Sequence, residues 1–396
     1  MGYVLFRGME KKSMKRKLIR VTTVPISLKI LLEGQLRFMN NYFEVIGVSS
    51  RGKELKEVEE REGIRTVSVD MSREITPFKD FISLIRMIIL FLKEKPDIVH
   101  THTPKAGIIG MLASWICRVP YRLHTVAGLP LMEAKGAKKQ LLLFVEKLTY
   151  ACATKVYPNS KGLEKYILDN KLTKKEKLKV IGYGSSNGVD TEFFYKSKEI
   201  IDKSLEIKKR YNLYDKFVFC FVGRVVKDKG VNELVFSFDK LSKEFENISL
   251  LLVGSYENSL DPISQKSKDI IKRNPDIIEV GFQNDIRPYL AISNCLVLPS
   301  YREGFPNVVL QALSIELPCI VTNINGCNEV VKDNVNGLIV EPKSKEDLYN
   351  AMKKLLIDKN LIDRLILNTR ENIVKKYDRK EFFKYLLNEY NEMLNA

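Results

Sequence analysis

The chain contains little of what metal centres, disulfide scaffolds and membrane spans require. Its six cysteines lie at irregular spacings without a C-x-x-C pair, which predicts buried thiols in a reducing compartment rather than a zinc site or a disulfide framework. No apolar run approaches the roughly 20 residues that a membrane-spanning helix needs. Met1 to Lys17 has too little apolar length for a secretory signal, and Met1 and Met14 both remain open as the translation start.

Charge is abundant and uneven. The net charge is +16; residues 1–200 hold 36 Lys and Arg against 21 Asp and Glu, whereas residues 201–396 hold 29 against 28. A basic amino-terminal half attracts nucleic acid, phosphorylated substrates or anionic lipid headgroups. A solvated lysine-rich surface explains the charge equally well. A nucleic-acid-binding protein is disfavoured, because the basic residues are dispersed and no RNA-binding signature or zinc finger is present.

Short β-rich runs alternate with helical patterns along the chain, which predicts parallel sheets covered on both faces. The first series of strands is expected at 18–23, 43–49, 66–69, 98–100, 121–126, 155–158 and 178–181, with helices at 27–40, 52–62, 79–94, 106–117, 137–152 and 161–169. The apolar run Phe81 to Leu92 is interpreted as a helix packed on a sheet, with an interfacial membrane anchor as the alternative.

A second series of strands begins at Phe217 and continues at 249–254, 277–281, 295–298 and 318–322, and helical periodicity resumes from Lys345 to the end. The glycines and small polar residues of Gly182 to Asp190 suit a hinge between the two series. The domain boundary is therefore expected between about 182 and 215.

The segment from Leu298 to Gln311 carries the strongest functional pattern. It predicts the end of a buried strand, a turn, and a helix that starts near Gly304 to Pro306. A helix that begins at the carboxyl end of a parallel strand presents free N–H groups and a positive dipole to an anion. Gln311 would lie roughly 12 Å along the helix from Glu303, so one element could contact both ends of a phosphate-containing ligand.

This segment resembles the E-x7-E motif of family 4 retaining glycosyltransferases, which have the GT-B fold: α/β, with two Rossmann-like domains whose parallel sheets face each other across a cleft. The resemblance implies that Glu303 contacts the transferred sugar and that the second position holds the ribose, where this chain has Gln311 in place of Glu. An amide can bond a ribose hydroxyl without charge assistance. The donor-binding residues expected from the segment are Glu303, Gly304, Phe305, Pro306, Asn307, Val308 and Gln311.

Phe221 to Gly230 follows the first strand of the second series and places Gly223, Arg224 and Lys229 where open α/β sheets bind ligands. The family has a basic pair in this setting, which clamps the donor diphosphate, and fixed cations stabilise the charge of a departing diphosphate without a metal. No metal and no cofactor are therefore expected. The alternative is that both side chains are surface charges that cap a helix or pair with Asp228.

The three histidines, His100, His102 and His124, each fall at a predicted strand end. Metal binding is possible by residue type, but no nearby carboxylate or cysteine completes a set. The resemblance implies that His124 contacts the donor sugar, and His124 is grouped with Glu303, Arg224 and Lys229 as catalytic. His102, Lys105 and Gly34 are assigned to the acceptor side. Asn323 to Glu329 resembles a family loop near the donor.

The resemblance implies a retaining hexosyl- or N-acetylhexosaminyl-transferase of the bacterial capsule, O-antigen or lipid-linked oligosaccharide type. It would move sugar from a nucleotide donor, expected to be a UDP-sugar, to a glycan or polyprenyl-diphosphate-linked acceptor. Residues 1–190 are expected to form the acceptor-side domain, 191–378 the donor-binding domain, and 379–396 a helix that crosses back. The expected location is the cytoplasm, peripherally at the anionic inner face of the membrane. A nucleotide-sugar epimerase or hydrolase remains an alternative.

Overall fold

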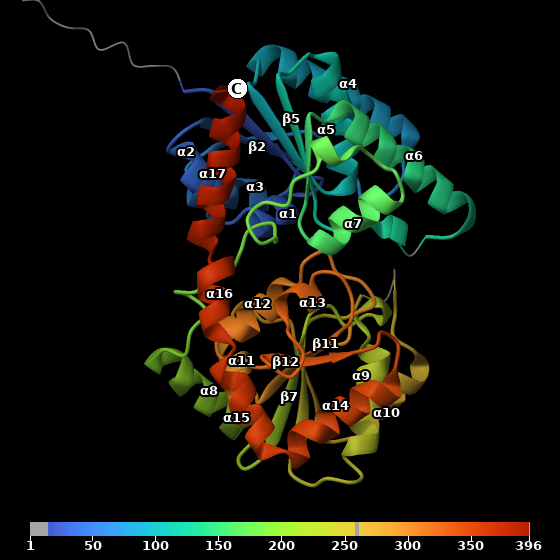
Figure 1. Ribbon diagram of the computed structural model, residues 1–396, viewed down its shortest axis with the longest axis vertical. Coiled ribbons are helices and arrows are strands. Elements are labelled where there is room, and N and C mark those ends of the chain that lie inside the picture. The colour runs from blue at the N-terminus through green and yellow to red at the C-terminus, as the bar shows by residue number, and fades with distance from the viewer. Residues whose placement is uncertain (1–14, 133, 258–260, 396) are drawn as a thin grey trace, which may run out of the picture. The chain divides into compact units, whose positions relative to one another are not determined.

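The computed structural model describes residues 15–132, 134–257 and 261–395, which form two six-stranded parallel sheets covered by helices (Figure 1). The prediction about Met1 and Met14 lies outside these residues. Within them, no helix is both long and apolar enough to cross a membrane. None of the six cysteines, all of which lie in the described ranges, forms a disulfide, and all are buried except Cys117, which is half-buried. The fold class predicted from the alternating pattern is confirmed.

The first sheet has the strand order β3-β2-β1-β4-β5-β6. Its strands are β1 (Lys17–Val21), β2 (Glu44–Ser49), β3 (Arg65–Ser68), β4 (Ile98–His102), β5 (Tyr121–Val126) and β6 (Lys155–Pro158). The connecting helices are α1 (Pro25–Leu31), α2 (Gln35–Asn40), α3 (Glu54–Glu62), α4 (Pro77–Glu94), α5 (Pro104–Ile116), α6 (Gly136–Cys152) and α7 (Lys161–Asp169). Helix α1 packs against α3, and α4 packs against α5.

The second sheet has the strand order β12-β11-β10-β7-β8-β9. Its strands are β7 (Phe217–Val222), β8 (Ile248–Val253), β9 (Ile277–Gly281), β10 (Cys295–Leu298), β11 (Cys319–Thr322) and β12 (Gly337–Val340). The helices are α8 (Lys198–Arg210), α9 (Val231–Leu241), α10 (Gln265–Arg273), α11 (Arg287–Ile292), α12 (Asn307–Ser314), α13 (Cys327–Val330), α14 (Lys345–Ile357), α15 (Lys359–Leu367), α16 (Arg370–Tyr377) and α17 (Arg379–Asn395). The central strands β7, β8 and β10 are almost wholly buried because helices cover both faces.

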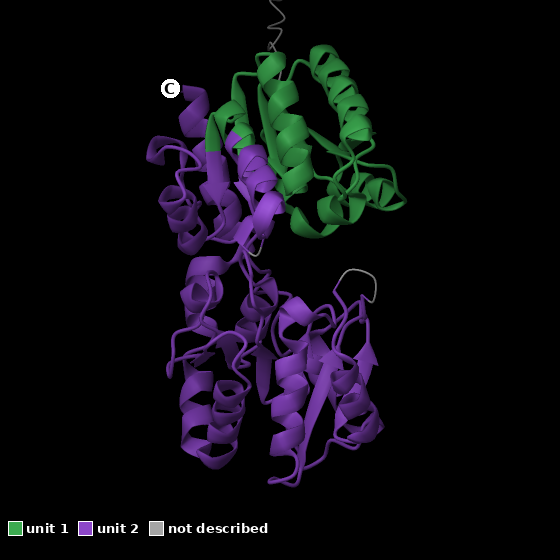
Figure 2. Cartoon of the chain, turned by 90° about the vertical axis from the view of Figure 1, so that its right-hand side faces the viewer, with its two compact units in different colours: residues 1–124, 148–155 green, residues 125–147, 156–396 purple. Residues whose placement is uncertain are grey.

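By packing, the chain separates into two units: Met1–His124 with Leu148–Lys155, and Thr125–Lys147 with Val156–Ala396 (Figure 2). The second unit therefore contains the second sheet, helix α17 and the segment that follows His124. Within this unit the Tyr157 hydroxyl donates a 3.1 Å hydrogen bond to Glu389 of α17. The three-part division at 190 and 378 stays a prediction.

Two local predictions were wrong, and one strand was not predicted. The helix expected over 27–40 is two helices, because α1 ends at Leu31 and Gly34, in a left-handed conformation (φ 73°), directly precedes α2. The strand expected at 178–181 is reduced to a single bridge between Leu178 and Val156, because a turn containing Gly182 and Gly184, both with positive φ, follows directly. Strand β12 was not predicted.

Candidate active site

The two predicted donor motifs meet at one edge of the second sheet. Strands β7 and β10 are neighbours, so Gly223 and Arg224 after β7 lie beside the segment 299–304 after β10. The chain between Arg224 and α9 forms a short 3-10 turn, Lys227–Lys229, that presents Lys229 at this edge. The carboxyl ends of adjacent parallel strands are where open α/β sheets bind ligands.

Lys229 and Glu303 form an ion pair, with 2.5 Å between Nζ and Oε1, and both side chains are largely buried. The Ser300 hydroxyl donates a second hydrogen bond, 2.8 Å long, to the same carboxylate oxygen. The backbone carbonyl of Glu303 accepts a 2.6 Å hydrogen bond from the Asn325 amide. Glu303 is therefore held from both its side chain and its backbone, and Asn325 belongs to the loop predicted to lie near the donor.

A cavity of about 160 Å³ opens beside this pair. It contains four of the predicted donor residues, and its lining is Ala127, Gly128, Leu129, Met132, Arg224, Asp228, Lys229, Arg302, Glu303 and Gly304. The lining includes three cationic side chains, Arg224, Lys229 and Arg302, and each of them is paired with a carboxylate. Arg and Lys side chains are the partners that a diphosphate prefers. The predicted residues Gly223, Phe305, Pro306, Asn307, Val308 and Gln311 are outside this lining.

The backbone of Gly304 lies directly against the segment after β5. A Cβ atom added at this glycine would lie 1.7 Å from the carbonyl oxygen of Ala127 and 3.0 Å from the nitrogen of Gly128. Only glycine permits this approach. The close contact joins the turn that carries Glu303 to the loop of Ala127 and Gly128, which also lines the cavity.

The cavity includes residues that the sequence analysis did not select. Arg302 pairs with Asp228 at 2.9 Å, and the Tyr301 N–H donates to the carbonyl of Asp228 at 2.8 Å. The suggestion that Asp228 pairs with Arg224 or Lys229 is therefore wrong in this structure, since Arg224 pairs with Glu257 instead. Arg302 stands within the motif itself, immediately before Glu303, and this adjacency was the signal that could have identified it.

Helix α12 begins at Asn307, after the predicted start near Gly304 to Pro306, so the estimate of about 12 Å along a helix between Glu303 and Gln311 does not apply. Its first helical residue is Asn307, so residues 303–306 form a non-helical turn and only four helical steps, about 6 Å, separate Asn307 from Gln311. Pro306 precedes the helix and no side chain caps it. Phe305 is buried, with its ring 5.5 Å from that of Tyr377. Gln311 is half-buried, and its expected contact with the ribose stays a prediction.

All three histidines are buried: His102 ends β4, whereas His100 and His124 lie within β4 and β5 and not at strand ends as predicted. His124 Nδ1 lies 2.8 Å from the Thr101 hydroxyl, and His102 Nε2 lies 2.8 Å from a guanidinium nitrogen of Arg20. The rings of His100 and His102 stack with 4.5 Å between centroids. Burial lowers the pKa of His124 to about 4; burial, together with Arg20, holds the pKa of His100 and of His102 well below the usual range. The three imidazoles are therefore neutral near pH 7, and the role predicted for His124 and His102 requires no imidazolium.

The remaining acceptor-side candidates are engaged within the first unit. Lys105 forms an ion pair with Asp80. The N–H of Gly34 donates a 3.0 Å hydrogen bond to the buried carboxylate of Glu62, whose other oxygen accepts from the N–H of Arg37. Contacts of Lys105 and Gly34 with an acceptor stay predictions.

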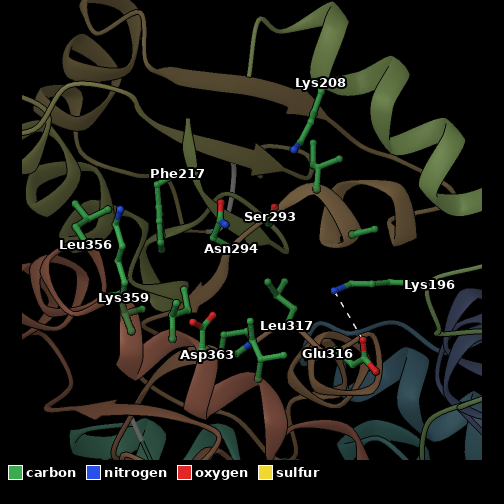
Figure 3. Close-up of a pocket in the computed structure, with 16 residues that line it drawn as sticks. Lys196, Lys208, Phe217, Ser293, Asn294, Glu316, Leu317, Leu356, Lys359 and Asp363 are labelled. Atoms are coloured by element: carbon green, nitrogen blue, oxygen red, sulfur yellow. Dashed lines mark ion pairs between the residues drawn. The ribbon is translucent and has the colours of Figure 1, made fainter. Parts of the chain in front are cut away.

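A larger cavity, about 400 Å³, lies at the opposite edge of the second sheet, around the beginning of β7 and the segments that lead into β10 and β11 (Figure 3). Figure 3 shows Lys196 reaching Glu316, 4.0 Å away, while Lys208, Lys359 and Asp363 point from helices α8 and α15. Burial lowers the pKa of Lys196. None of the predicted site residues lines this cavity.

A metal site was not predicted, and the ranges 15–132, 134–257 and 261–395 contain no group of three His, Cys, Asp or Glu side chains that could hold a metal ion.

Two six-stranded parallel sheets of this kind define a GT-B protein. The chain superposes on a crystal structure of Alr3699/HepE from Anabaena in complex with UDP and glucose with a TM-score of 0.81. The match covers 95% of this chain and 100% of that one at 17% identity, so it shows the fold alone. Sucrose-phosphate synthase from Thermosynechococcus elongatus gives a TM-score of 0.76 at 19% identity, over 96% and 100% of the two chains.

The chain belongs to the family of group 1 glycosyl transferases, and it is a glycosyltransferase. Residues 203–372 match the model of "Glycosyl transferases group 1" and residues 43–184 match "Glycosyl transferase 4-like domain". The capsular polysaccharide biosynthesis glycosyltransferase CapM of Staphylococcus aureus is 36% identical over 96% of this chain and 98% of its own length. The UDP-Gal:alpha-D-GlcNAc-diphosphoundecaprenol alpha-1,3-galactosyltransferase of Escherichia coli is 32% identical over 78% and 80%. The resemblance stated from the motifs is confirmed.

Proposed function

We propose that the cavity beside Lys229 and Glu303 binds the diphosphate and the sugar of a UDP-sugar, and that the enzyme transfers this sugar with retention. The acceptor is a polyprenyl-diphosphate-linked sugar or glycan. The observation that carries the proposal is the ion pair itself. Lys229 is a cation suited to phosphate and Glu303 a carboxylate suited to sugar hydroxyls, and both line a cavity whose other charged residues are Arg224, Arg302 and Asp228.

The choice of donor and acceptor is supported by what related enzymes act on. The Escherichia coli relative is named for UDP-galactose and a diphosphoundecaprenol-linked acceptor. A Campylobacter jejuni relative, 25% identical over 84% of this chain, is named as an alpha-1,3-N-acetylgalactosaminyltransferase acting on a diphospho-undecaprenol-linked sugar. Hexose and N-acetylhexosamine donors both fit this pattern.

The transfer reaction requires the protein to position the two substrates and to stabilise the charge of the leaving diphosphate. The bond between the sugar's anomeric carbon and the diphosphate oxygen breaks, a bond to the acceptor hydroxyl forms on the same face, and the acceptor proton passes to the departing phosphate. Arg224 and Lys229 stabilise the negative charge that develops on the diphosphate. Glu303 orients the sugar through its hydroxyls, and His124, neutral near pH 7, is proposed to contact the same sugar.

The acceptor side of the reaction is assigned to residues 1–190, including His102, Lys105 and Gly34, and the donor side to residues 191–378. We further propose that the enzyme works peripherally at the cytoplasmic face of a membrane, where a polyprenyl-linked acceptor is anchored. The excess of basic residues in the first half of the sequence supports attraction to anionic headgroups.

The proposal is tested by substitution at the ion pair. Glu303→Ala, Lys229→Ala and Arg224→Ala are each expected to abolish transfer while leaving the melting temperature near that of the wild type. Lys227→Ala provides a matched control, because Lys227 is an exposed lysine of the same turn that does not line the cavity. Wild-type turnover in all three cavity variants would overturn the assignment.

The donor is identified by a thermal-shift panel of UDP-, GDP- and TDP-sugars. A donor at 100 times its dissociation constant stabilises the fold by about 2.7 kcal/mol. The alternative of an epimerase or hydrolase is tested by incubating the enzyme with donor alone and then with donor and acceptor. An epimerised or hydrolysed sugar in the first reaction, with no transfer in the second, would establish the alternative.

A further inference from the structure

Helix α4 exposes a continuous apolar stripe that the fold does not cover. The stripe consists of Phe78, Phe81, Ile82, Ile85, Ile89 and Leu92, whose exposed fractions range from 37% to 78%. At 100° per residue these six side chains fall within a sector of about 100°. The opposite face, which includes Met87, Leu90 and Phe91, is buried. The helix is therefore apolar on two faces, and only one of them serves the core.

The stripe is flanked by cations at the same helical spacing. Lys79, Arg86 and Lys93 recur every seven residues along one side of it, and all three are exposed. The two acidic residues of α4 are directed elsewhere: Asp80 pairs with Lys105, and Glu94 is buried and paired with Lys17 and Arg65. Arg86 is bridged to Asp70 at 2.9 Å. The exposed side of α4 thus combines apolar and positive character.

The end of α5 extends the same surface. The thiol of Cys117 lies 3.7 Å from the carbonyl oxygen of Ile88, so the end of α5 contacts α4. Immediately before it, Trp115 and Ile116 are 56% and 46% exposed, and Arg118 is exposed immediately after. Trp is the side chain that prefers the boundary between hydrocarbon and headgroups.

We infer that α4, with the end of α5, is the surface through which this enzyme inserts into an anionic lipid bilayer, with α4 lying in the plane of the interface. An 18-residue helix is about 27 Å long, and the pairing of an apolar stripe with a basic flank is the chemistry that such helices use. A second copy of the chain is the less suitable occupant, because a net charge of +16 opposes self-association. The inference rests on the proposed function in one respect: membrane binding brings the enzyme to a membrane-anchored acceptor.

The test compares two matched triple variants of the full chain. Phe81→Ser/Ile85→Ser/Ile89→Ser removes the centre of the stripe. Phe282→Ser/Ile357→Ser/Leu367→Ser removes three apolar side chains that lie outside α4 and are at least as exposed. Binding is measured by co-flotation with vesicles of equimolar phosphatidylglycerol and phosphatidylcholine, and with vesicles of phosphatidylcholine alone. The stripe variant is expected to partition at least tenfold more weakly than wild type onto the anionic vesicles, and the control variant like wild type.

Lys79→Gln/Lys93→Gln is expected to weaken binding to the anionic vesicles and to reduce its dependence on salt.

Three outcomes overturn the inference: wild type that does not float with anionic vesicles, a stripe variant that binds like wild type, or a solution dimer that the stripe variant converts to a monomer. Failure of this inference and failure of the proposed function can be told apart by measuring transfer in two settings. The stripe variant should transfer sugar at the wild-type rate to an acceptor in detergent micelles and more slowly to an acceptor embedded in vesicles. Absence of transfer by wild type in micelles would count against the function and leave the vesicle result standing.

Discussion

The contact between Gly304 and Ala127 can be tested by adding one methyl group. In Gly304→Ala the new Cβ atom would lie 1.7 Å from the carbonyl oxygen of Ala127, whereas real Cβ atoms essentially never approach closer than 3.0 Å. The turn carrying Glu303 and the loop at Ala127 must therefore separate by about 1.3 Å. Because a displacement of about 1 Å in a positioned group can cost roughly 100-fold in rate, kcat/KM is expected to fall about 100-fold, or about 2.7 kcal/mol of transition-state stabilisation.

The assay is the initial rate of transfer, with the melting temperature measured in parallel. Gly281→Ala is the control: its φ of 76° makes alanine strained there, but no atom lies within 4 Å of the added Cβ. It should lose roughly 1–2 kcal/mol of stability and keep its activity. If Gly304→Ala transfers sugar at the wild-type rate, the contact between Gly304 and Ala127 does not fix the geometry of the cavity, and the reasoning fails.

Three further predictions concern single side chains. The pKa of His124 is about 4 in the folded protein and about 6.5 in the unfolded chain, so the unfolded chain takes up the proton first as the pH falls. The free energy of unfolding should therefore decrease between pH 6.5 and pH 4, by on the order of 3 kcal/mol. In His124→Gln the slope of the unfolding free energy against pH in this interval should be smaller. Arg302→Met removes one cavity cation and the partner of Asp228, so donor KM should rise about tenfold in steady-state kinetics, and an unchanged KM would exclude Arg302 from the donor site. Gln311→Glu should change donor affinity by isothermal titration: tighter binding means that the amide is a weaker substitute for the family's carboxylate, and weaker binding means that it makes its own contact.

The sequence was sufficient to predict the alternating architecture because the strands are buried on both faces and read as continuous apolar runs. Strands β5, β6, β9 and β10 have the predicted bounds. The errors arose where local conformation overrides composition. A helical pattern runs through residues 27–40, yet one left-handed glycine divides it. Strand β12 is four residues long and begins with glycine, so its pattern is too short to separate from a loop.

For the candidate site, the sequence indicated Lys229 and Glu303 in two separate motifs but not that they pair. Lys229 and Glu303 are 74 residues apart, and only the adjacency of β7 and β10 brings them together. The wall formed by Ala127 and Gly128 was beyond sequence reasoning for the same reason, since no local pattern indicates that a loop will pack against Gly304. The exposure of the α4 stripe was expected only under the alternative of an interfacial anchor: a largely apolar helix is expected to be buried, and periodicity does not say that one apolar face is left open.

The pairing of Lys229 with Glu303 bears on how the enzyme would release its product. Lys229 and Glu303 pair with each other, so a molecule that binds between them must replace both halves of that interaction. In the proposed function a nucleotide sugar would do so, with phosphate oxygens for the lysine and hydroxyl donors for the carboxylate. A nucleoside diphosphate that has lost its sugar offers only the first, and leaves a carboxylate that is 13% exposed with Ser300 as its donor. Re-forming the internal pair then competes with the spent nucleotide, which favours its departure once transfer is complete.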